Sequence, residues 1–400
     1  MVRLPPVARP LYPYLKPLYS VGTGVLAPVT LALSRRRGGQ LPTGVATTLA
    51  EAARSTGGRC VVARPAEVLT RQLPTGIPAG HAAYPPERVE TVPAVEVAEL
   101  PRGRVYGPHH ALISGNDELV QQLSFYFGTN RPRQHPLFLR PSGPPPLEVP
   151  GRLGVLATRG DVNYYHYLID VLPRLAVLAQ VPEIEAPERW YATANQRFQR
   201  ELLDRFGITE ERRIDAYANP HVRADVLVVP APPSMTVINP PWVVPFLRET
   251  LLATPIARIP GQGLYLTRGG TANNRQVTNE AEVVEFLAAK GFRSVDPGKL
   301  TVAEQIEAFA SATCIVGAHG AAFGNLVFAS PGSTVIELFP AGAALPDFWK
   351  LSSGVEGLRY RYLCGSGPVK GRSRAQMLVR DITVDLRNLG VMVDQALGAD

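Results

Sequence analysis

The chain has 400 residues, of which 45% are hydrophobic, so it holds enough apolar material for two domains of ordinary size and is not an intrinsically disordered protein. Its 41 basic and 34 acidic residues give a formal charge of +7, but the basic residues are dispersed, which argues against nucleic-acid binding and favours anionic ligands or a membrane surface. Cys60, Cys314 and Cys364 are too widely spaced to indicate a disulfide framework or a cysteine metal site, and a reducing compartment fits them.

Residues 1–40 form the first predicted segment. Within it, residues 18–34 are mostly apolar and are followed by Arg35, Arg36 and Arg37. The stretch is short for a membrane span, which needs about 20 apolar residues, and arginine follows it where a signal peptide would have small residues. Two interpretations stay open, namely an ordinary packed segment and a peripheral contact in which the arginines meet anionic lipid.

Helix and strand patterns alternate through the middle of the chain. Two proline-rich stretches, 131–151 and 230–245, are predicted to be connections, because proline disfavours helices and central strands. Between them the pattern predicts strand 154–158, helix 164–180, strand 189–192, helix 196–206 and strand 225–229. This alternation predicts a parallel sheet covered by helices.

A second alternating series follows a linker at residues 254–261. It comprises predicted strands 264–267, 292–295, 314–316 and 334–339 and predicted helices 280–289 and 302–312. Capping boxes mark both helix starts, Asn279 with Glu282 and Thr301 with Glu304. Two separate series predict two sheets in one chain.

We therefore predict an α/β fold with two Rossmann-like domains that face each other across a cleft. The expected division is a segment 1–40, an N-terminal α/β domain 41–255, a C-terminal nucleotide-binding α/β domain 256–345, and an extension 346–400 that packs back on the domains. Neither a Walker A loop nor a Gly-x-Ser-x-Gly elbow is present, so those two chemistries are excluded.

The segment 314–340 carries the most informative pattern, CIVGAHGAAFGNLVFASPGSTVIELFP. Gly317 and Gly320 let the backbone turn tightly and approach a ligand closely, and His319 adds a donor in the same turn. A helix that starts near Ala321 would direct free N–H groups and its positive dipole end at that ligand. These features predict a diphosphate site.

Two further polar residues accompany this turn. Glu337 lies near the carboxyl end of the next predicted strand, where open α/β sheets bind ligands and where a carboxylate can accept hydrogen bonds from ribose hydroxyls. Asn325 lies on the short predicted helix. Both are predicted to contact the nucleotide; the alternatives are a hydrogen bond within its own helix for Asn325 and an ion pair with an arginine for Glu337.

A third pattern is the segment 163–175, NYYHYLIDVLPRL. His166, Asp170 and Arg174 are spaced four residues apart, so they would line one face of a helix. The alternative is that Asp170 simply pairs with one of its neighbours on an exposed face. Pro173 is expected to kink the helix.

Three segments in this order resemble glycosyltransferase family 61, many of whose bacterial members are capsular polysaccharide biosynthesis proteins. They are NYYHYLIDVLPRL, LYLTRGGTANNRQVTNEAEVVEFL and GAHGAAFGNLVFASPGSTVIELFP, which together cover about residues 150–340. The resemblance implies a GT-B-type fold and an enzyme that moves a hexosyl or pentosyl group from a nucleotide-sugar donor to a glycan or lipid-linked glycan.

Transfer with inversion needs a base that takes the proton of the acceptor hydroxyl. We expect Asp170 to act directly or to orient His166 as the base, with Asn163 and Arg174 as acceptor-binding or supporting residues. The chain has no Asp-x-Asp pair to hold a metal ion. Arg268 and Arg275 are instead expected to hold the diphosphate, which predicts metal-independent transfer without a cofactor; the alternative for both is a solvated loop arginine.

The expected setting is surface or capsular polysaccharide assembly in the cytoplasm or on the inner face of the membrane; the oligomeric state stays open. Two other functions stay as alternatives. An NAD-dependent oxidoreductase would use Gly317, Gly320 and Glu337, although a third glycine is misplaced for it. A catalytically inactive nucleotide-sugar-binding assembly protein would tolerate loss of Asp170 and His166.

Overall fold

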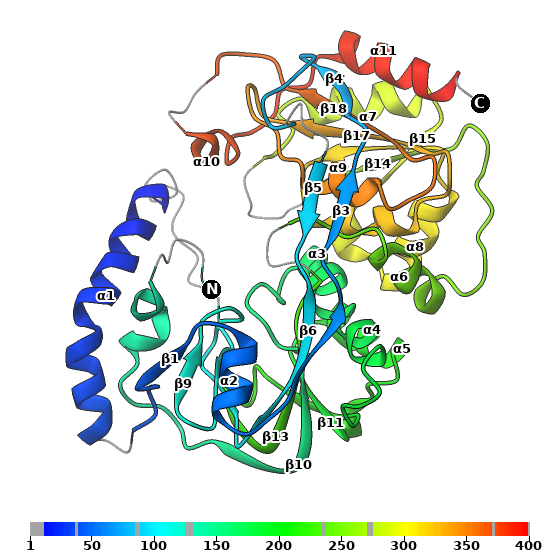
Figure 1. Cartoon of the computed structure of the whole chain (residues 1–400). Coiled ribbons are helices and arrows are strands. Elements are labelled where there is room, and N and C mark those ends of the chain that lie inside the picture. Colours follow the sequence, from blue (N-terminus) through cyan, green and yellow to red (C-terminus); the bar gives the residue numbers. More distant parts are fainter. Residues whose placement is uncertain are drawn as a thin grey trace. The chain divides into compact units, whose positions relative to one another are not determined.

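The computed structural model describes residues 12–36, 39–84, 89–124, 126, 131–233, 237–269, 275–369 and 373–398. The chain forms two compact units (Figure 1). The N-terminal unit comprises Met1–Ala66 and Pro93–Pro233, and the C-terminal unit comprises Glu67–Val92 and Ser234–Asp400. Both contain parallel strands and helices, which confirms the predicted α/β class. The cleft between two domains stays a prediction.

The N-terminal unit is built on a mixed sheet of ten strands within the described ranges, in the order β1-β9-β8-β7-β13-β10-β11-β12, with β6 paired to β13 and to β2. The strands are β1 (Gly44–Ala46), β2 (Cys60–Arg64), β6 (Val95–Pro101), β7 (Arg104–Tyr106), β8 (Ala111–Ile113), β9 (Glu118–Val120), β10 (Leu147–Val155), β11 (Arg189–Ala192), β12 (Arg213–Asp215) and β13 (His221–Pro230). Within this order β10 is parallel to β13 and to β11, and β11 is parallel to β12, so this part of the sheet is parallel as the alternating pattern predicts. Strand β13 is antiparallel to β7 and β6.

Helices of this unit pack apolar faces on the sheet or on its edge. They are α1 (Tyr12–Arg36), α2 (Leu49–Ser55), α3 (Tyr164–His166), α4 (Arg174–Ala179) and α5 (Arg197–Arg205), with 3₁₀ turns at Pro132–Gln134, Pro136–Leu139 and Glu210–Arg212. The core beneath them includes Leu100, Leu153, Tyr191 and Leu227, all fully buried. No helix in the described part of the chain is long and apolar enough to span a bilayer.

Two sequence predictions for this unit were wrong in detail. Residues 131–151 are not all connection, because 3₁₀ turns begin at Pro132 and Pro136 and β10 begins at Leu147. Proline is tolerated at a first helical position, where no N–H is needed, and in the register shift of β10 between Val149 and Arg152. The strand predicted at 154–158 therefore overlaps only the last two residues of β10, and residues 156–158 lie beyond the strand.

The helix predicted over residues 164–180 is divided into three parts. A π-helical turn over Tyr167–Val171 separates α3 from α4. There the N–H of Leu172 donates to the carbonyl oxygen of Tyr167, five residues back, at 3.1 Å. Pro173 follows directly and has no N–H to continue the regular ladder. Single π turns of this kind are frequent at functional sites.

The C-terminal unit contains a parallel sheet of six strands within the described ranges, in the order β15-β14-β16-β17-β18-β4. They are β4 (Thr75–Ile77), β14 (Gly263–Leu266), β15 (Phe292–Val295), β16 (Cys314–Ala318), β17 (Thr334–Phe339) and β18 (Arg359–Cys364). The helices are α6 (Val243–Leu251), α7 (Glu280–Ala288), α8 (Val302–Ser311), α9 (Asp347–Ser352), α10 (Arg374–Met377) and α11 (Leu386–Leu397), with 3₁₀ turns at Pro297–Lys299 and Ala321–Phe328.

Only one of the two predicted capping boxes forms. Thr301 and Glu304 close a complete box at the start of α8, with the Glu304 N–H donating to Thr301 Oγ1 at 3.2 Å. The side chain of Asn279 makes no cap bond to α7. Its amide instead pairs with both backbone groups of Val384, at 3.0 Å each, because it offers a donor and an acceptor side by side.

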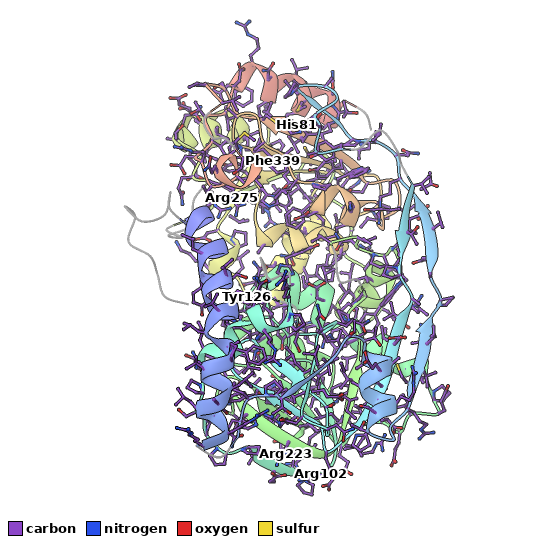
Figure 2. The ribbon with its side chains drawn as sticks, turned by 60° about the vertical axis from the view of Figure 1, so that its left-hand side comes forward. His81, Arg102, Tyr126, Arg223, Arg275 and Phe339 are labelled. Carbon is purple, nitrogen blue, oxygen red and sulfur yellow. The ribbon has the colours of Figure 1, made fainter. Side chains whose placement is uncertain are left out.

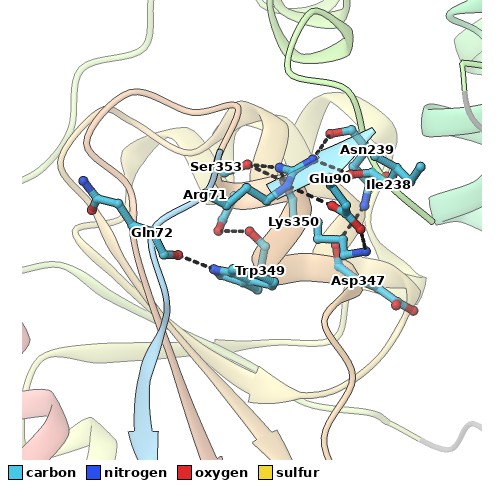
Figure 3. Close-up of polar contacts among 10 residues, drawn as sticks. Arg71, Gln72, Glu90, Ile238, Asn239, Asp347, Trp349, Lys350 and Ser353 are labelled. Carbon is cyan, nitrogen blue, oxygen red and sulfur yellow. Dashed lines mark hydrogen bonds and ion pairs between the residues drawn. The ribbon is translucent and has the colours of Figure 1, made fainter. Parts of the chain in front are cut away.

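Residues Glu67–Val92 belong to the C-terminal unit, whereas the sequence prediction included them in a domain 41–255. Strand β4 pairs with β18, and β3 (Glu67–Thr70) pairs with β5 (Val89–Val92). The buried Arg71 fastens this segment, donating to the carbonyl oxygens of Lys350 at 2.7 Å and Ile238 at 2.6 Å (Figure 3). The paired strands β4 and β18 are nearly 300 residues apart in the sequence, so no local sequence pattern predicts that they pair.

Candidate functional site

In the sheet of each unit, one strand pairs on both sides with strands that come later in the chain. The order of the strands reverses at this strand. In the C-terminal unit this strand is β14, which lies between β15 and β16; in the N-terminal unit it is β10, which lies between β11 and β13. Open α/β sheets bind ligands at the carboxyl ends of such strands. Arg268 and His319 follow the carboxyl ends of β14 and β16, and His166 and Asp170 follow β10.

Arg268 joins the two strand ends of the C-terminal unit. Its Nη1 donates to the main-chain oxygen of His319 at 2.7 Å, and burial lowers the pKa of the guanidinium, although Asp381 and Glu280 raise it. A Cβ atom at Gly320 would lie 2.7 Å from the same Nη1. The glycine at position 320 therefore makes room for Arg268.

The structure gives Gly317 and Gly320 a role that differs from the predicted one, which was to let the backbone turn tightly. Gly320 has φ of −180°, an extended conformation that any residue adopts, so the turn itself does not require glycine. Gly317 lies inside β16, and a Cβ there would be 2.8 Å from the Cβ of Leu266. Both glycines are needed for close packing rather than for backbone freedom.

Arg275 is a second guanidinium at this place. Burial lowers its pKa to about 10, the neighbouring charge of Arg268 lowers it as well, and Glu337 raises it. Its backbone has φ of +73°, a left-handed conformation that costs a residue with a Cβ on the order of 1 kcal/mol or more. Its Nε is buried and has no hydrogen-bond partner among the described residues. Figure 2 labels Arg275 in the C-terminal unit.

His319 is held by a buried chain of hydrogen bonds. Its Nδ1 contacts Oε1 of Glu337, and the Tyr360 hydroxyl donates to Oε2 of the same carboxyl group. The Tyr84 hydroxyl lies 3.1 Å from that of Tyr360. The ring of His319 stacks on Phe339 with a centroid distance of 5.3 Å. These contacts determine the orientation of the imidazole and engage Nδ1, so Nε2 is the ring nitrogen that Glu337 does not hold.

Glu337 is fully buried, and burial raises its pKa to about 8, while the Tyr360 hydroxyl and Arg275 lower it. Asn325 is also fully buried; it donates to Oε1 of Gln305 at 2.9 Å and to the carbonyl oxygen of Ala322 at 3.1 Å. The helix over Ala321–Phe328 that holds it is of the 3₁₀ type. Direct nucleotide contact stays a prediction for both residues, and their observed contacts position the turn.

The N-terminal unit places His166 and Asp170 together. His166 Nδ1 lies 2.7 Å from Asp170 Oδ2, and each side chain is 28% exposed. The π turn carries Asp170, and the Oδ1 of Asn163 caps α3 by accepting from the N–H of Tyr165 at 3.0 Å. Gly160, at φ +101°, lies against the His166 ring, and a Cβ there would be 3.5 Å from it. The pair is therefore held in place and partly exposed.

Arg174 does not share the exposed position of this pair. It is 3% exposed, and it donates to the main-chain oxygens of Asp170 at 3.1 Å and Val155 at 3.3 Å. Burial lowers its pKa to about 10, although Asp170 and Asp161 raise it. Arg174 thus connects the π turn to the end of β10. The side chains of Asn163 and Arg174 both bond to the main chain around the His166–Asp170 pair, which is a supporting role.

Sequence patterns did not reveal Asp161. This buried residue accepts from Thr193 Oγ1 at 2.6 Å and from the Thr158 N–H at 3.1 Å, and it lies 3.4 Å from Nε2 of His110. It organises the loop that leads from β10 to His166. Tyr84 and Tyr360 were missed as well, because each reaches the site from a segment with no recognisable motif.

The two groups can perform complementary chemistry. Arg268, Arg275 and His319 present positive charge and N–H donors at the end of two strands, which suits an anion such as a diphosphate. His166 with Asp170 has the geometry of an oriented general base. Among the described residues no three His, Cys, Asp or Glu side chains are grouped so that they could bind a metal ion.

One comparison with known proteins agrees with the sequence resemblance. The family model described as Glycosyltransferase 61 matches residues 164–336. The matched range includes His166, Asp170, Arg268, Arg275 and His319. It begins directly after Asn163 and ends directly before Glu337. A search of curated proteins gave no match.

Proposed function

We propose that this glycosyltransferase, whose residues 164–336 form its family 61 domain, transfers a sugar from a nucleotide-sugar donor to a glycan acceptor with inversion and without a metal ion. The family match establishes the enzyme class and the need for a donor and an acceptor. Donor type, stereochemistry and metal independence are our proposals from the arrangement of side chains.

One observation carries the donor assignment. Two half-buried arginines, Arg268 and Arg275, lie close enough that the charge of Arg268 lowers the pKa of Arg275. Arg268 donates to the main-chain oxygen of His319, and the charge of Glu337, which holds His319, raises the pKa of Arg275. Placing two like charges together costs free energy. Asp381, Glu280 and Glu337 offset part of this cost, and an anionic ligand would offset more of it. A departing nucleoside diphosphate is such an anion, and its developing charge would be neutralised by the arginines and by His319.

The acceptor side uses the pair in the N-terminal unit. The bond between His166 Nδ1 and Asp170 Oδ2 favours His166 as the base, with its Nε2 taking the proton of the acceptor hydroxyl and Asp170 stabilising the imidazolium. As this proton leaves, the acceptor oxygen bonds to the anomeric carbon and the bond to the diphosphate breaks. The sugar thereby changes its anomeric configuration.

The biological setting follows from the family resemblance. We propose a GT-B-type enzyme that acts in the cytoplasm on a glycan or lipid-linked glycan during surface or capsular polysaccharide assembly. The oxidoreductase alternative is disfavoured, because residues 164–336 match a glycosyltransferase family model. The inactive-protein alternative is disfavoured because the His166–Asp170 pair is intact.

A donor-binding and turnover experiment tests this function. Purified protein is incubated with UDP-, GDP-, CMP- and TDP-sugars in the presence of EDTA, and release of the nucleotide is measured with and without candidate glycan acceptors. Acceptor-dependent release of one nucleotide supports the proposal. Loss of all release in EDTA, with recovery on addition of Mn²⁺, would contradict metal independence.

A further inference from the structure

Helix α1 carries a large apolar face that the rest of the N-terminal unit does not cover. From Leu18 onward, the side chains at positions 20, 23, 27, 31 and 34 are buried, and they are mostly small: Ser20, Thr23, Ala27, Leu31 and Ser34. The larger apolar side chains lie on the opposite face. Leu18, Val25 and Val29 are 69%, 71% and 59% exposed.

These exposed residues form a continuous stripe. Leu18, Val21, Val25, Val29 and Leu33 recur at three- and four-residue intervals, which places them on one side of a helix. No charged residue interrupts α1 between Leu18 and Ser34, and the exposed face ends at Arg35 and Arg36. Figures 1 and 2 both show α1 at the periphery of the N-terminal unit.

The charge around this stripe is of one sign. The first 50 residues contain six basic residues and no acidic residue, since Glu51 is the first carboxylate of the chain. Beside the stripe, a surface hollow of about 540 Å³ is lined by Val21, Val25 and Val45 together with Arg131 and Arg133, both of which are exposed. Apolar side chains next to arginines match the acyl and headgroup regions of an anionic phospholipid.

We propose that the exposed face of α1 docks the protein on an anionic membrane, with the helix lying in the plane of the interface. Because the other face of α1 packs on Leu137, Phe138 and their neighbours, the helix enters the bilayer only to the depth of its outer side chains. Arg35, Arg36, Arg131 and Arg133 contact lipid phosphates. This inference does not depend on the sugar donor or on the reaction.

Vesicle sedimentation with the full-length protein tests the proposal. The probes are vesicles of phosphatidylcholine alone and vesicles with about 30% phosphatidylglycerol, whose surface potential attracts basic residues. The variants are Val25→Asp/Val29→Asp and Arg131→Gln/Arg133→Gln. Val391→Asp is the matched control, because Val391 is an exposed valine on another helix, α11.

The wild-type protein is expected to bind the anionic vesicles at least about tenfold more strongly than the neutral ones. The double aspartate variant should bind the anionic vesicles at least about tenfold more weakly than wild type. The double glutamine variant should lose part of the preference for anionic lipid, because Arg35 and Arg36 remain, whereas Val391→Asp should bind like wild type. The proposal is overturned if wild type stays in the supernatant or if Val25→Asp/Val29→Asp sediments as wild type does. It is also overturned if light scattering without lipid shows an oligomer that this double variant dissociates, since the face would then bind a second copy.

Discussion

The side chain of Arg268 donates to the main-chain oxygen of His319 at 2.7 Å and so connects the ends of β14 and β16. This bond brings a guanidinium from one strand to a histidine from its neighbour, at the place where the strand order of the C-terminal unit reverses. The buried Glu337 holds the other side of the same histidine. Residues from three segments therefore converge on one turn, at which we propose that an anion binds.

Loss of the arginine charges should weaken nucleotide binding. A charge-assisted hydrogen bond contributes about 1.5–3 kcal/mol, so Arg268→Gln and Arg275→Gln should each raise the dissociation constant of the preferred nucleoside diphosphate by about 10- to 100-fold. Calorimetric titration measures this. Arg102→Gln is the control, because Arg102 is an exposed arginine paired with Asp225 in the N-terminal unit. If all three variants bound the nucleotide with equal affinity, Arg268 and Arg275 would not contribute to nucleotide binding.

A methyl group at position 320 should act through Arg268. In Gly320→Ala the new Cβ would lie 2.7 Å from Arg268 Nη1 and would displace the guanidinium, while the extended backbone stays unchanged. We expect weaker nucleotide binding with little loss of stability. Gly22→Ala, where no atom lies within 4 Å of the added Cβ, is the control. If nucleotide titration gave the same affinity for both variants, the position of Arg268 would not matter for binding.

The base hypothesis predicts a loss of turnover without a loss of donor binding. His166→Ala and Asp170→Asn should each lower kcat by about 10²- to 10⁴-fold, the range that general-base catalysis contributes, and leave the affinity for the nucleotide unchanged. Single-turnover assays with donor and acceptor check this. Retention of nearly full turnover by both variants would rule the pair out as the base.

The raised pKa of Glu337 predicts a pH dependence of stability. Burial raises it to about 8 in the folded protein, whereas an unfolded chain releases this proton near a pKa of about 4.3. Between these values the unfolded chain binds fewer protons, so the free energy of unfolding should fall as the pH rises from about 5 to 8. Above pH 8 the Glu337 carboxyl group is ionised in both the folded and the unfolded protein, so it should no longer make the free energy of unfolding depend on pH.

Glu337→Gln keeps the shape of the side chain and removes this proton. Between pH 5 and pH 8 the free energy of unfolding of the wild-type protein should therefore fall by on the order of a few kcal/mol relative to that of the variant. Urea unfolding at pH 5, 6, 7 and 8 measures this difference. Glu249→Gln, at an exposed position on α6, should follow the wild-type curve. Parallel curves for wild type and Glu337→Gln would show that the buried carboxyl group does not titrate in this range.

Local periodicity was sufficient to predict much of the fold. The bounds of β11, β15 and β17 agree with the predicted strands, and the capping box of Thr301 marked the start of α8 correctly. These elements carry their own apolar pattern and end signals. The π turn was not predictable from the same pattern, because Pro173 changes the hydrogen-bond ladder without changing the spacing of the apolar side chains.

Long-range pairing accounts for what the sequence did not reveal. Strand β4 has three residues and joins the sheet through β18, and the hydroxyl of Tyr84 is linked to Glu337 through the hydroxyl of Tyr360. Asp161 likewise depends on partners from separate loops and strands. Motif order was enough to identify Arg268, Arg275, His166, Asp170 and His319 as candidates. Burial and partners were needed to show that Arg174 is buried and bonded to the main chain, whereas His166 and Asp170 are partly exposed.

The most direct test of the central claim is a thermal-shift titration of wild type and Arg275→Gln with UDP, GDP, CMP, TDP, NAD and NADP in EDTA. A ligand at 100 times its dissociation constant stabilises the native state by about 2.7 kcal/mol, enough for a clear rise in Tm. We predict that one nucleoside diphosphate raises the Tm of wild type in EDTA and does so far less for Arg275→Gln. Stabilisation by NAD alone, or an equal rise for the variant, would contradict a metal-independent nucleotide-sugar site at these arginines.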